Sequence, residues 1–166
     1  MLKDALNNIL REITLFDNIL GSPKHRPEIK DCGEPRPETE AYTKILKETV
    51  HSRSSLLVDL TILWGTEKCY LEAWQFAKDS HNRQSSPENK STHDAQDIQD
   101  ADSKSLLLNT LISNWTCSDF VDFVKHIENL TNELANSSEY ASDWQNCRDT
   151  WTKVLSVEKG FWPAAA

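Results

Sequence analysis

The segment at residues 55–77 is the feature that most constrains the fold of this chain. Its apolar residues do not keep to one side of a helix but occur nearly all round it: Leu56, Leu57, Val58, Leu60, Ile62, Leu63 and Trp64. A helix without a polar face must be surrounded by other elements, because it would otherwise expose apolar surface to water. We therefore expect a long central helix around which the rest of the chain packs.

Helical spacing also marks the other parts of the chain. Residues 1–20 carry apolar side chains at steps of three and four, and this pattern stops at Gly21 and Pro23. A second helix is expected at about 41–50, after Pro37, since proline favours the first turn of a helix. Further helices are expected at about 105–115, 118–135 and 138–162. No stretch alternates like a strand, so the predicted fold class is all-α.

Residues 79–104 differ from the rest of the chain, because they contain one aliphatic residue larger than alanine. Such a segment cannot bury enough apolar surface to offset its ordering entropy. We expect a mobile polar insertion here, within a single helical domain that spans residues 1–162. The stretch 21–37, rich in proline, is expected to be a loop.

Charge and composition exclude several classes of function. The net charge is −8, and no segment gathers Lys and Arg on one face, which argues against nucleic-acid binding. No apolar run is long enough to cross a bilayer, and residues 1–20 are not a secretory signal, so we expect a cytoplasmic protein without a membrane partner. The four cysteines form no metal-binding pattern, so no metal site is expected.

Two carboxylates occupy positions where an apolar side chain would fit the pattern. Glu67 shares a helix face with Leu63 and Tyr70, and Glu158 lies between Trp151 and Phe161 in the last helix. Apolar surroundings disfavour the ionised form of a carboxyl group, and this environment suits a general acid or base. The alternative is a structural glutamate that accepts a hydrogen bond from a buried Tyr or Trp, and both interpretations stay open.

Aromatic side chains are the second signal. They could line a flat pocket for a planar heterocycle, or they could simply fill a helical core, which the pattern alone favours. The residues concerned are Tyr42, Trp64, Tyr70, Trp74, Trp115, Phe161 and Trp162.

Five short motifs resemble helices of the TenA/thiaminase II family, in particular the subgroup with a glutamate-centred site in place of the catalytic cysteine. They are LTILWGTEKCYLEAWQFAKD with Glu67 and Tyr70, VLSVEKGFW with Glu158 and Phe161, PRPETEAYTKIL with Tyr42, LISNWTCSDF with Trp115, and EITLF with Glu12. They follow one another in the family's order over residues 1–162, interrupted by the polar segment.

The resemblance implies a heme-oxygenase-like helical bundle that forms a homo-oligomer and needs no metal or cofactor. It also implies hydrolysis of an aminopyrimidine breakdown product of thiamin, which yields hydroxymethylpyrimidine. Carried over to this chain, Glu158 is the acid/base and Glu67 stands in for the thiol. The residues that would bind the pyrimidine are Tyr42, Tyr70, Trp115 and Phe161.

The resemblance also has a gap, because the family's opening helices, which grip the pyrimidine, have no counterpart before Met1. A truncated gene, a divergent protein without the activity and a chain completed by a partner would each explain it. A second hypothesis is therefore a non-catalytic helical binding or scaffold protein with an exposed apolar surface. A third is another enzyme on this fold, a cofactor-free oxidase or a metal-carboxylate oxygenase, although neither Glu67 nor Glu158 begins the Glu-x-x-His pair of the metal version.

Overall fold

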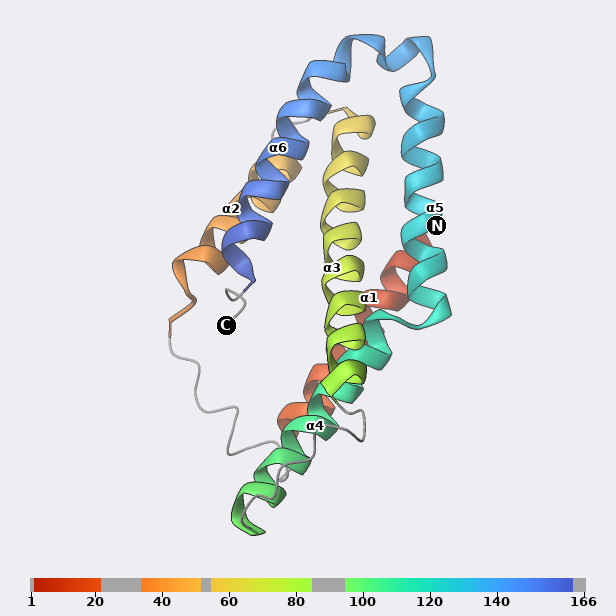
Figure 1. Ribbon diagram of the computed structural model, residues 1–166. Helices are drawn as coiled ribbons and strands as arrows, with labels where there is room; N and C mark the ends of the chain where they lie inside the picture. The colour runs from red at the N-terminus through yellow and green to blue at the C-terminus, as the bar shows by residue number, and fades with distance from the viewer. Residues whose placement is uncertain (1, 22–33, 52–54, 85–94, 163–166) are drawn as a thin grey trace. The chain divides into compact units, whose positions relative to one another are not determined.

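The computed structural model describes residues 2–21, 34–51, 55–84 and 95–162, and no strand occurs among them. This part of the chain confirms the all-α prediction, and none of its helices is long and apolar enough to span a bilayer. The helices are α1 Leu2–Gly21, α2 Pro37–His51, α3 Leu56–Gln84, α4 Ala95–Trp115, α5 Ser118–Ala135, the 3-10 helix η2 Ser138–Asp143 and α6 Trp144–Phe161 (Figure 1).

The helix ends follow the expected signals in some places and depart from them in others. The first helix ends at Gly21, as predicted, whereas the second begins at Pro37, earlier than the expected start at about residue 41. The polar segment 79–104 is helical at both ends, because α3 continues to Gln84 and α4 begins at Ala95. Polar residues without glycine or proline can continue a helix with a solvated face. Residues 85–94, which hold the rest of the expected insertion, lie outside the described residues, as does most of the expected loop at 21–37.

The last predicted helix is divided in two. Residues 138–143 form a 3-10 helix, and the α-helix begins only at Trp144. The Ser137 hydroxyl accepts a hydrogen bond from the Glu139 amide at 3.3 Å, which caps the short helix. The chain thereby turns from the end of α5 into α6.

Contacts within the chain divide it into two compact units. Unit 1 comprises Met1–Cys32 and Leu71–Phe123, and unit 2 comprises Gly33–Tyr70 and Val124–Ala166. Helices α3 and α5 each contribute to both. The single domain expected from the sequence stays a prediction, and each unit is described by itself.

Unit 2 is built around the first part of α3. Side chains on several sides of this helix are buried, including Leu57, Leu60 and Ile62, as its apolar composition predicts. They are covered by α5, from which Ile127 is fully buried, and by α6, from which Val154 is fully buried. The core thus lies between α3 and its neighbours.

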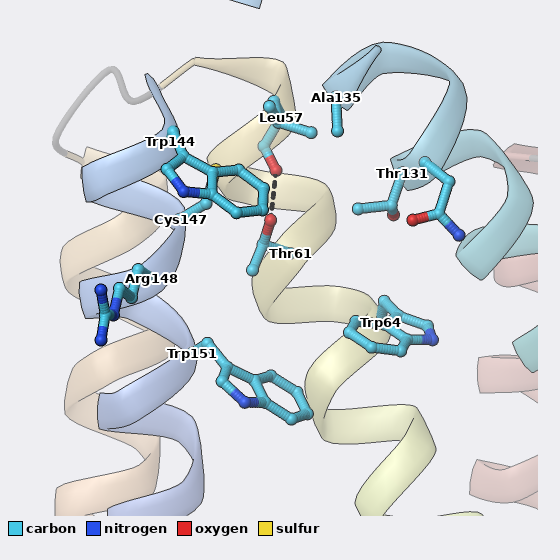
Figure 2. Close-up of a pocket in the computed structure, with 10 residues that line it drawn as sticks. Leu57, Thr61, Trp64, Thr131, Ala135, Trp144, Cys147, Arg148 and Trp151 are labelled. Carbon is cyan, nitrogen blue, oxygen red and sulfur yellow. Dashed lines mark hydrogen bonds between the residues drawn. The ribbon is translucent and has the colours of Figure 1, made fainter. Parts of the chain in front are cut away.

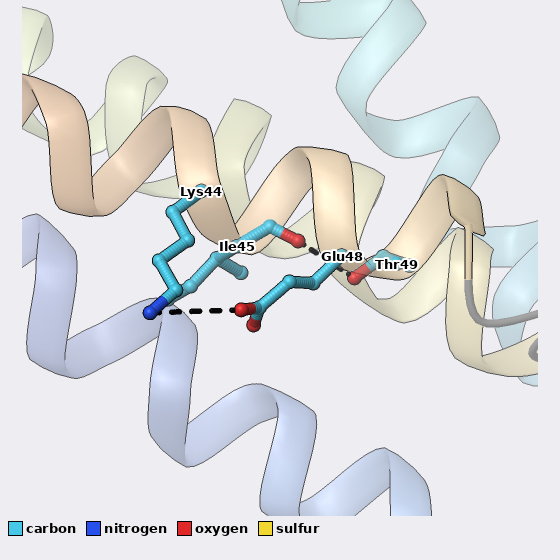
Figure 3. Close-up of polar contacts among 4 residues, drawn as sticks. All are labelled: Lys44, Ile45, Glu48 and Thr49. Atoms are coloured by element: carbon cyan, nitrogen blue, oxygen red, sulfur yellow. Dashed lines mark hydrogen bonds and ion pairs between the residues drawn. The ribbon is translucent and has the colours of Figure 1, made fainter.

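Helix α2 lies along α6 in unit 2 (Figure 1). Its solvent side carries an ion pair at i,i+4 between Lys44 Nζ and Glu48 Oε1, 3.7 Å apart (Figure 3). Both side chains are largely exposed, so this pair contributes little to stability. The Arg36 guanidinium, just before α2, donates a hydrogen bond to the Phe161 carbonyl at 2.9 Å and ties the start of α2 to the end of α6.

Unit 1 contains an aromatic cluster around Trp115, whose indole is buried. The Trp74 ring stacks on it with a centroid distance of 5.0 Å, and Phe16 lies 5.9 Å away. The Trp115 indole donates a hydrogen bond to Glu12 Oε1 at 3.0 Å. One face of α1 stays open to solvent, with apolar side chains that are about half exposed: Leu6, Ile9, Leu10, Ile13 and Phe16.

Candidate functional site

The carboxylate of Glu158 is the centre of the candidate site. It lies in the last turn of α6 and is only 4% exposed. The Tyr42 hydroxyl donates a hydrogen bond to its Oε1 at 2.6 Å, and the Trp162 indole donates one to its Oε2 at 2.7 Å. Both distances lie at the short end of the range for protein hydrogen bonds. Each oxygen therefore has one protein donor and one lone-pair direction left.

The local geometry of the helix end brings Trp162 to Glu158. Residue 162 leaves α6 in an extended conformation, with φ −75° and ψ 140°, while its amide still donates to the Glu158 carbonyl. Because residues four apart lie on one helix face, the indole points back to the carboxylate one turn earlier. Tyr42 comes from α2, the helix that lies along α6, so the site joins two helices far apart in the sequence.

Aromatic rings surround this carboxylate. The rings of Tyr42 and Phe161 are 5.4 Å apart, and the Tyr70 ring lies 5.1 Å from Trp162 and 6.4 Å from Phe161. These three expected site residues, Tyr42, Tyr70 and Phe161, are therefore brought together with Glu158. Tilted rings at such distances add a favourable contact beyond the area they bury.

The Tyr42 hydroxyl is held in its protonated form. Burial raises the pKa of Tyr42 above its usual value of 10.0, and the hydrogen bond and negative charge of Glu158 raise it further. The Tyr70 hydroxyl acts in the same direction, while a hydrogen bond from Thr66 acts against it. Tyr42 is thus a fixed hydrogen-bond donor to the carboxylate and not a base.

The other expected site residues are placed differently. Glu67 lies half-buried on α3, one turn before Tyr70 in unit 2. Trp115 belongs to unit 1, and the contacts described for it, with Glu12, Phe16 and Trp74, lie within that unit. That Glu67 and Trp115 reach the same substrate as Glu158 stays a prediction.

Two features of unit 1 and unit 2 were not expected from the sequence. Burial raises the pKa of Glu12, and this effect outweighs those of its Trp115 hydrogen bond and of the Arg11 charge, which lower the pKa.

In unit 2 a cavity of about 500 Å³ lies between α3, α5 and α6, with Arg148 among its lining residues. The sequence signal for Arg148 was its position four residues after Trp144 and three before Trp151, on one face of α6.

Among the residues that the structure describes, no group of three or more His, Cys, Asp or Glu side chains is arranged to hold a metal ion. No protein family, no curated protein and no solved structure matches this chain. The geometry of its own residues is thus the basis for a functional proposal.

Proposed function

We propose that this chain is a hydrolase of the TenA type that acts on an aminopyrimidine, with Glu158 as its acid/base. The observation that carries the proposal is the nearly inaccessible Glu158 carboxylate, bonded to Tyr42 and Trp162 at 2.6 and 2.7 Å. Aromatic rings of the kind that pack against a flat heterocycle enclose it, and the sequence motifs of that family supply the same residues.

The proposed reaction breaks the bond between the exocyclic methylene carbon of the pyrimidine and its amine nitrogen, and it forms a bond from that carbon to a water oxygen. The Glu158 carboxylate takes a proton from the attacking water and delivers it to the leaving nitrogen, so it acts first as base and then as acid, while Glu67 accepts a hydrogen bond from that water. Tyr42 stays protonated and orients the Glu158 carboxyl. No metal or cofactor enters this scheme.

One observation favours a second candidate, a non-catalytic helical binding or scaffold protein. Both oxygens of Glu158 already accept a hydrogen bond from the chain. In the second candidate, these hydrogen bonds have a purely structural role and hold α2 against the end of α6. The exposed apolar face of α1 would then be an interaction surface. The same face supports our proposal that the chain forms a homo-oligomer in either case.

The first experiment is a thermal melt of the purified chain with excess hydroxymethylpyrimidine. A ligand that binds only the folded state at about 100 times its Kd adds about 2.7 kcal/mol, which corresponds to a rise of several degrees. The second is an assay of amine release from an aminomethyl-substituted aminopyrimidine. We expect Glu158→Gln to lower kcat by about a hundredfold or more.

The matched control is Glu48→Gln, which removes an exposed carboxylate from α2 and should leave both readouts unchanged. A cooperative melt that hydroxymethylpyrimidine does not shift, together with no amine release, would overturn the hydrolase proposal in favour of the scaffold protein. Equal activity of Glu158→Gln and the unmodified chain would remove Glu158 from the mechanism.

A further inference from the structure

The cavity between α3, α5 and α6 is separate from the Glu158 site. It has a volume of about 500 Å³, within the range of about 300–1,000 Å³ that small-molecule sites occupy. Residues that line it include Thr61, Trp64, Trp144, Arg148 and Trp151 (Figure 2). Glu158 is not among its lining residues and lies about two helical turns beyond Trp151 on α6.

Three tryptophans give the cavity flat apolar walls. The rings of Trp64 and Trp151 stack at a centroid distance of 5.1 Å and an interplanar angle of 19°. Trp144 extends from α6 towards α3 in Figure 2, yet it is 69% exposed. An indole that lines a cavity and still faces solvent is available to cover a flat ligand.

The polar groups of the cavity point to the charge of the ligand. The Thr61 and Thr131 hydroxyls donate to the carbonyls of Leu57 and Ile127 at 2.8 Å each, so they are satisfied within their own helices. Arg148 is the charged residue among the lining residues described. Its neighbour Asp149 accepts a hydrogen bond from Gln145 at 2.9 Å. Figure 2 draws the Arg148 guanidinium on the outer side of α6, away from the Trp144 and Trp151 rings, so this exposed side chain has to rotate toward the cavity to select an anion.

We propose that this cavity binds a planar aromatic carboxylate. The ring system lies against Trp144 and Trp151, and the carboxylate pairs with the Arg148 guanidinium in a bidentate manner. The inference does not depend on the proposed hydrolase activity, because the cavity shares no residue with the site around Glu158. It also concerns a different ligand class, an acid instead of an aminopyrimidine.

The test is a calorimetric titration of the full chain with naphthoate, and with neutral naphthylmethanol of the same ring size. We expect saturable naphthoate binding with a stoichiometry of one, and weaker binding of naphthylmethanol. Arg148→Gln should weaken naphthoate binding by about tenfold or more, while it leaves naphthylmethanol binding unchanged. Trp144→Ala should weaken the binding of both.

Arg148 and Trp144 are exposed, so their replacement should leave the melting temperature close to that of the unmodified chain. Lys153→Gln is the matched control, because it removes an exposed cation from α6 outside the cavity. Absence of saturable binding, equal affinity for both probes, or an equal effect of Lys153→Gln and Arg148→Gln would each overturn the proposal. A concentration-dependent dimer that Trp144→Ala dissociates, without probe binding, would assign the cavity to a second copy and also overturn it.

Discussion

Gly65 provides the sharpest test of the packing in unit 2. A Cβ atom added at this position would lie 2.9 Å from Trp151 Cζ3, 3.1 Å from Trp151 Cε3 and 3.2 Å from Val154 Cγ1. Carbon atoms pack favourably at about 3.5–4.0 Å, so the neighbours would have to retreat by about half an ångström or more. Val154 is fully buried and the Trp151 ring stacks on Trp64, so neither can move without disturbing other contacts.

The expected change in the free energy of unfolding follows from two opposing effects of Gly65→Ala. Alanine in a helix interior is more favourable than glycine by about 0.5–1 kcal/mol, whereas overpacking costs about 1–3 kcal/mol. We expect the substitution to lower the free energy of unfolding by about 1–2 kcal/mol. For a chain of this length that corresponds to a fall in the melting temperature of about 2–8 °C.

Gly160→Ala is the matched control, because the nearest heavy atom to its added Cβ is Glu38 Cγ at 3.7 Å, an ordinary contact. It should leave the melting temperature unchanged or raise it by a few degrees. Both variants are measured by circular dichroism on heating and by urea unfolding followed through tryptophan fluorescence. A Gly65→Ala chain as stable as Gly160→Ala would refute the close approach of Trp151 to α3.

Three further predictions concern titration and association. Because the pKa of Tyr42 is raised in the folded state, its contribution to stability is complete below pH 10 and is lost as the pH rises above that value. In urea unfolding, Tyr42→Phe should therefore show a smaller decrease in the free energy of unfolding above pH 10 than the unmodified chain. Because the pKa of Glu12 is also raised, stability from this group is present below pH 4.5 and is lost as the pH rises through the folded pKa, so Glu12→Gln should gain stability relative to the unmodified chain between pH 4 and 7. Ile9→Glu with Ile13→Glu should abolish self-association in sedimentation runs, whereas Asn18→Glu, on the opposite side of α1, should not.

Local patterns predicted the helices well where a glycine or proline coincides with the end of an apolar stripe. Gly21 ends α1 and Pro37 begins α2 because each residue favours that position in the backbone. The pattern misled where only polarity was available, since a run of polar residues without a breaker continues α3 to Gln84. The heme-oxygenase-like arrangement stays a proposal, because periodicity carries no information on how helices are ordered in space.

The candidate site was predictable from the sequence only in part. Glu158 stood out because a carboxylate occupied an apolar position, and Trp162 one turn later was a visible partner for it. Tyr42 is 116 residues away from Glu158, and spacing alone could not connect the two. Likewise, nothing in the sequence indicated that the Trp115 indole would bond to Glu12, 103 residues earlier.

A repeat along α6 suggests how to separate a structural from a catalytic role of Glu158. Trp144, Trp151 and Glu158 follow one another at intervals of seven residues, so they share one stripe of the helix. The carboxylate is the polar member of this stripe, at a position where an apolar residue would pack against α2. A buried charge at such a place lowers stability unless it is compensated, and it is retained where it fixes register or performs chemistry.

The decisive comparison is between Glu158→Leu alone and a triple variant that also carries Tyr42→Phe and Trp162→Phe. The single change leaves the Tyr42 hydroxyl and the Trp162 indole without their acceptor, and we expect it to lower stability by about 2–5 kcal/mol. The triple variant removes all three polar groups and should recover to within about 1 kcal/mol of the unmodified chain or exceed it. A triple variant that is stable but inactive would mean that Glu158 has a catalytic role and is not needed for stability. A triple variant as unstable as the single one would instead mean that the hydrogen bonds of Glu158 hold α2 on α6.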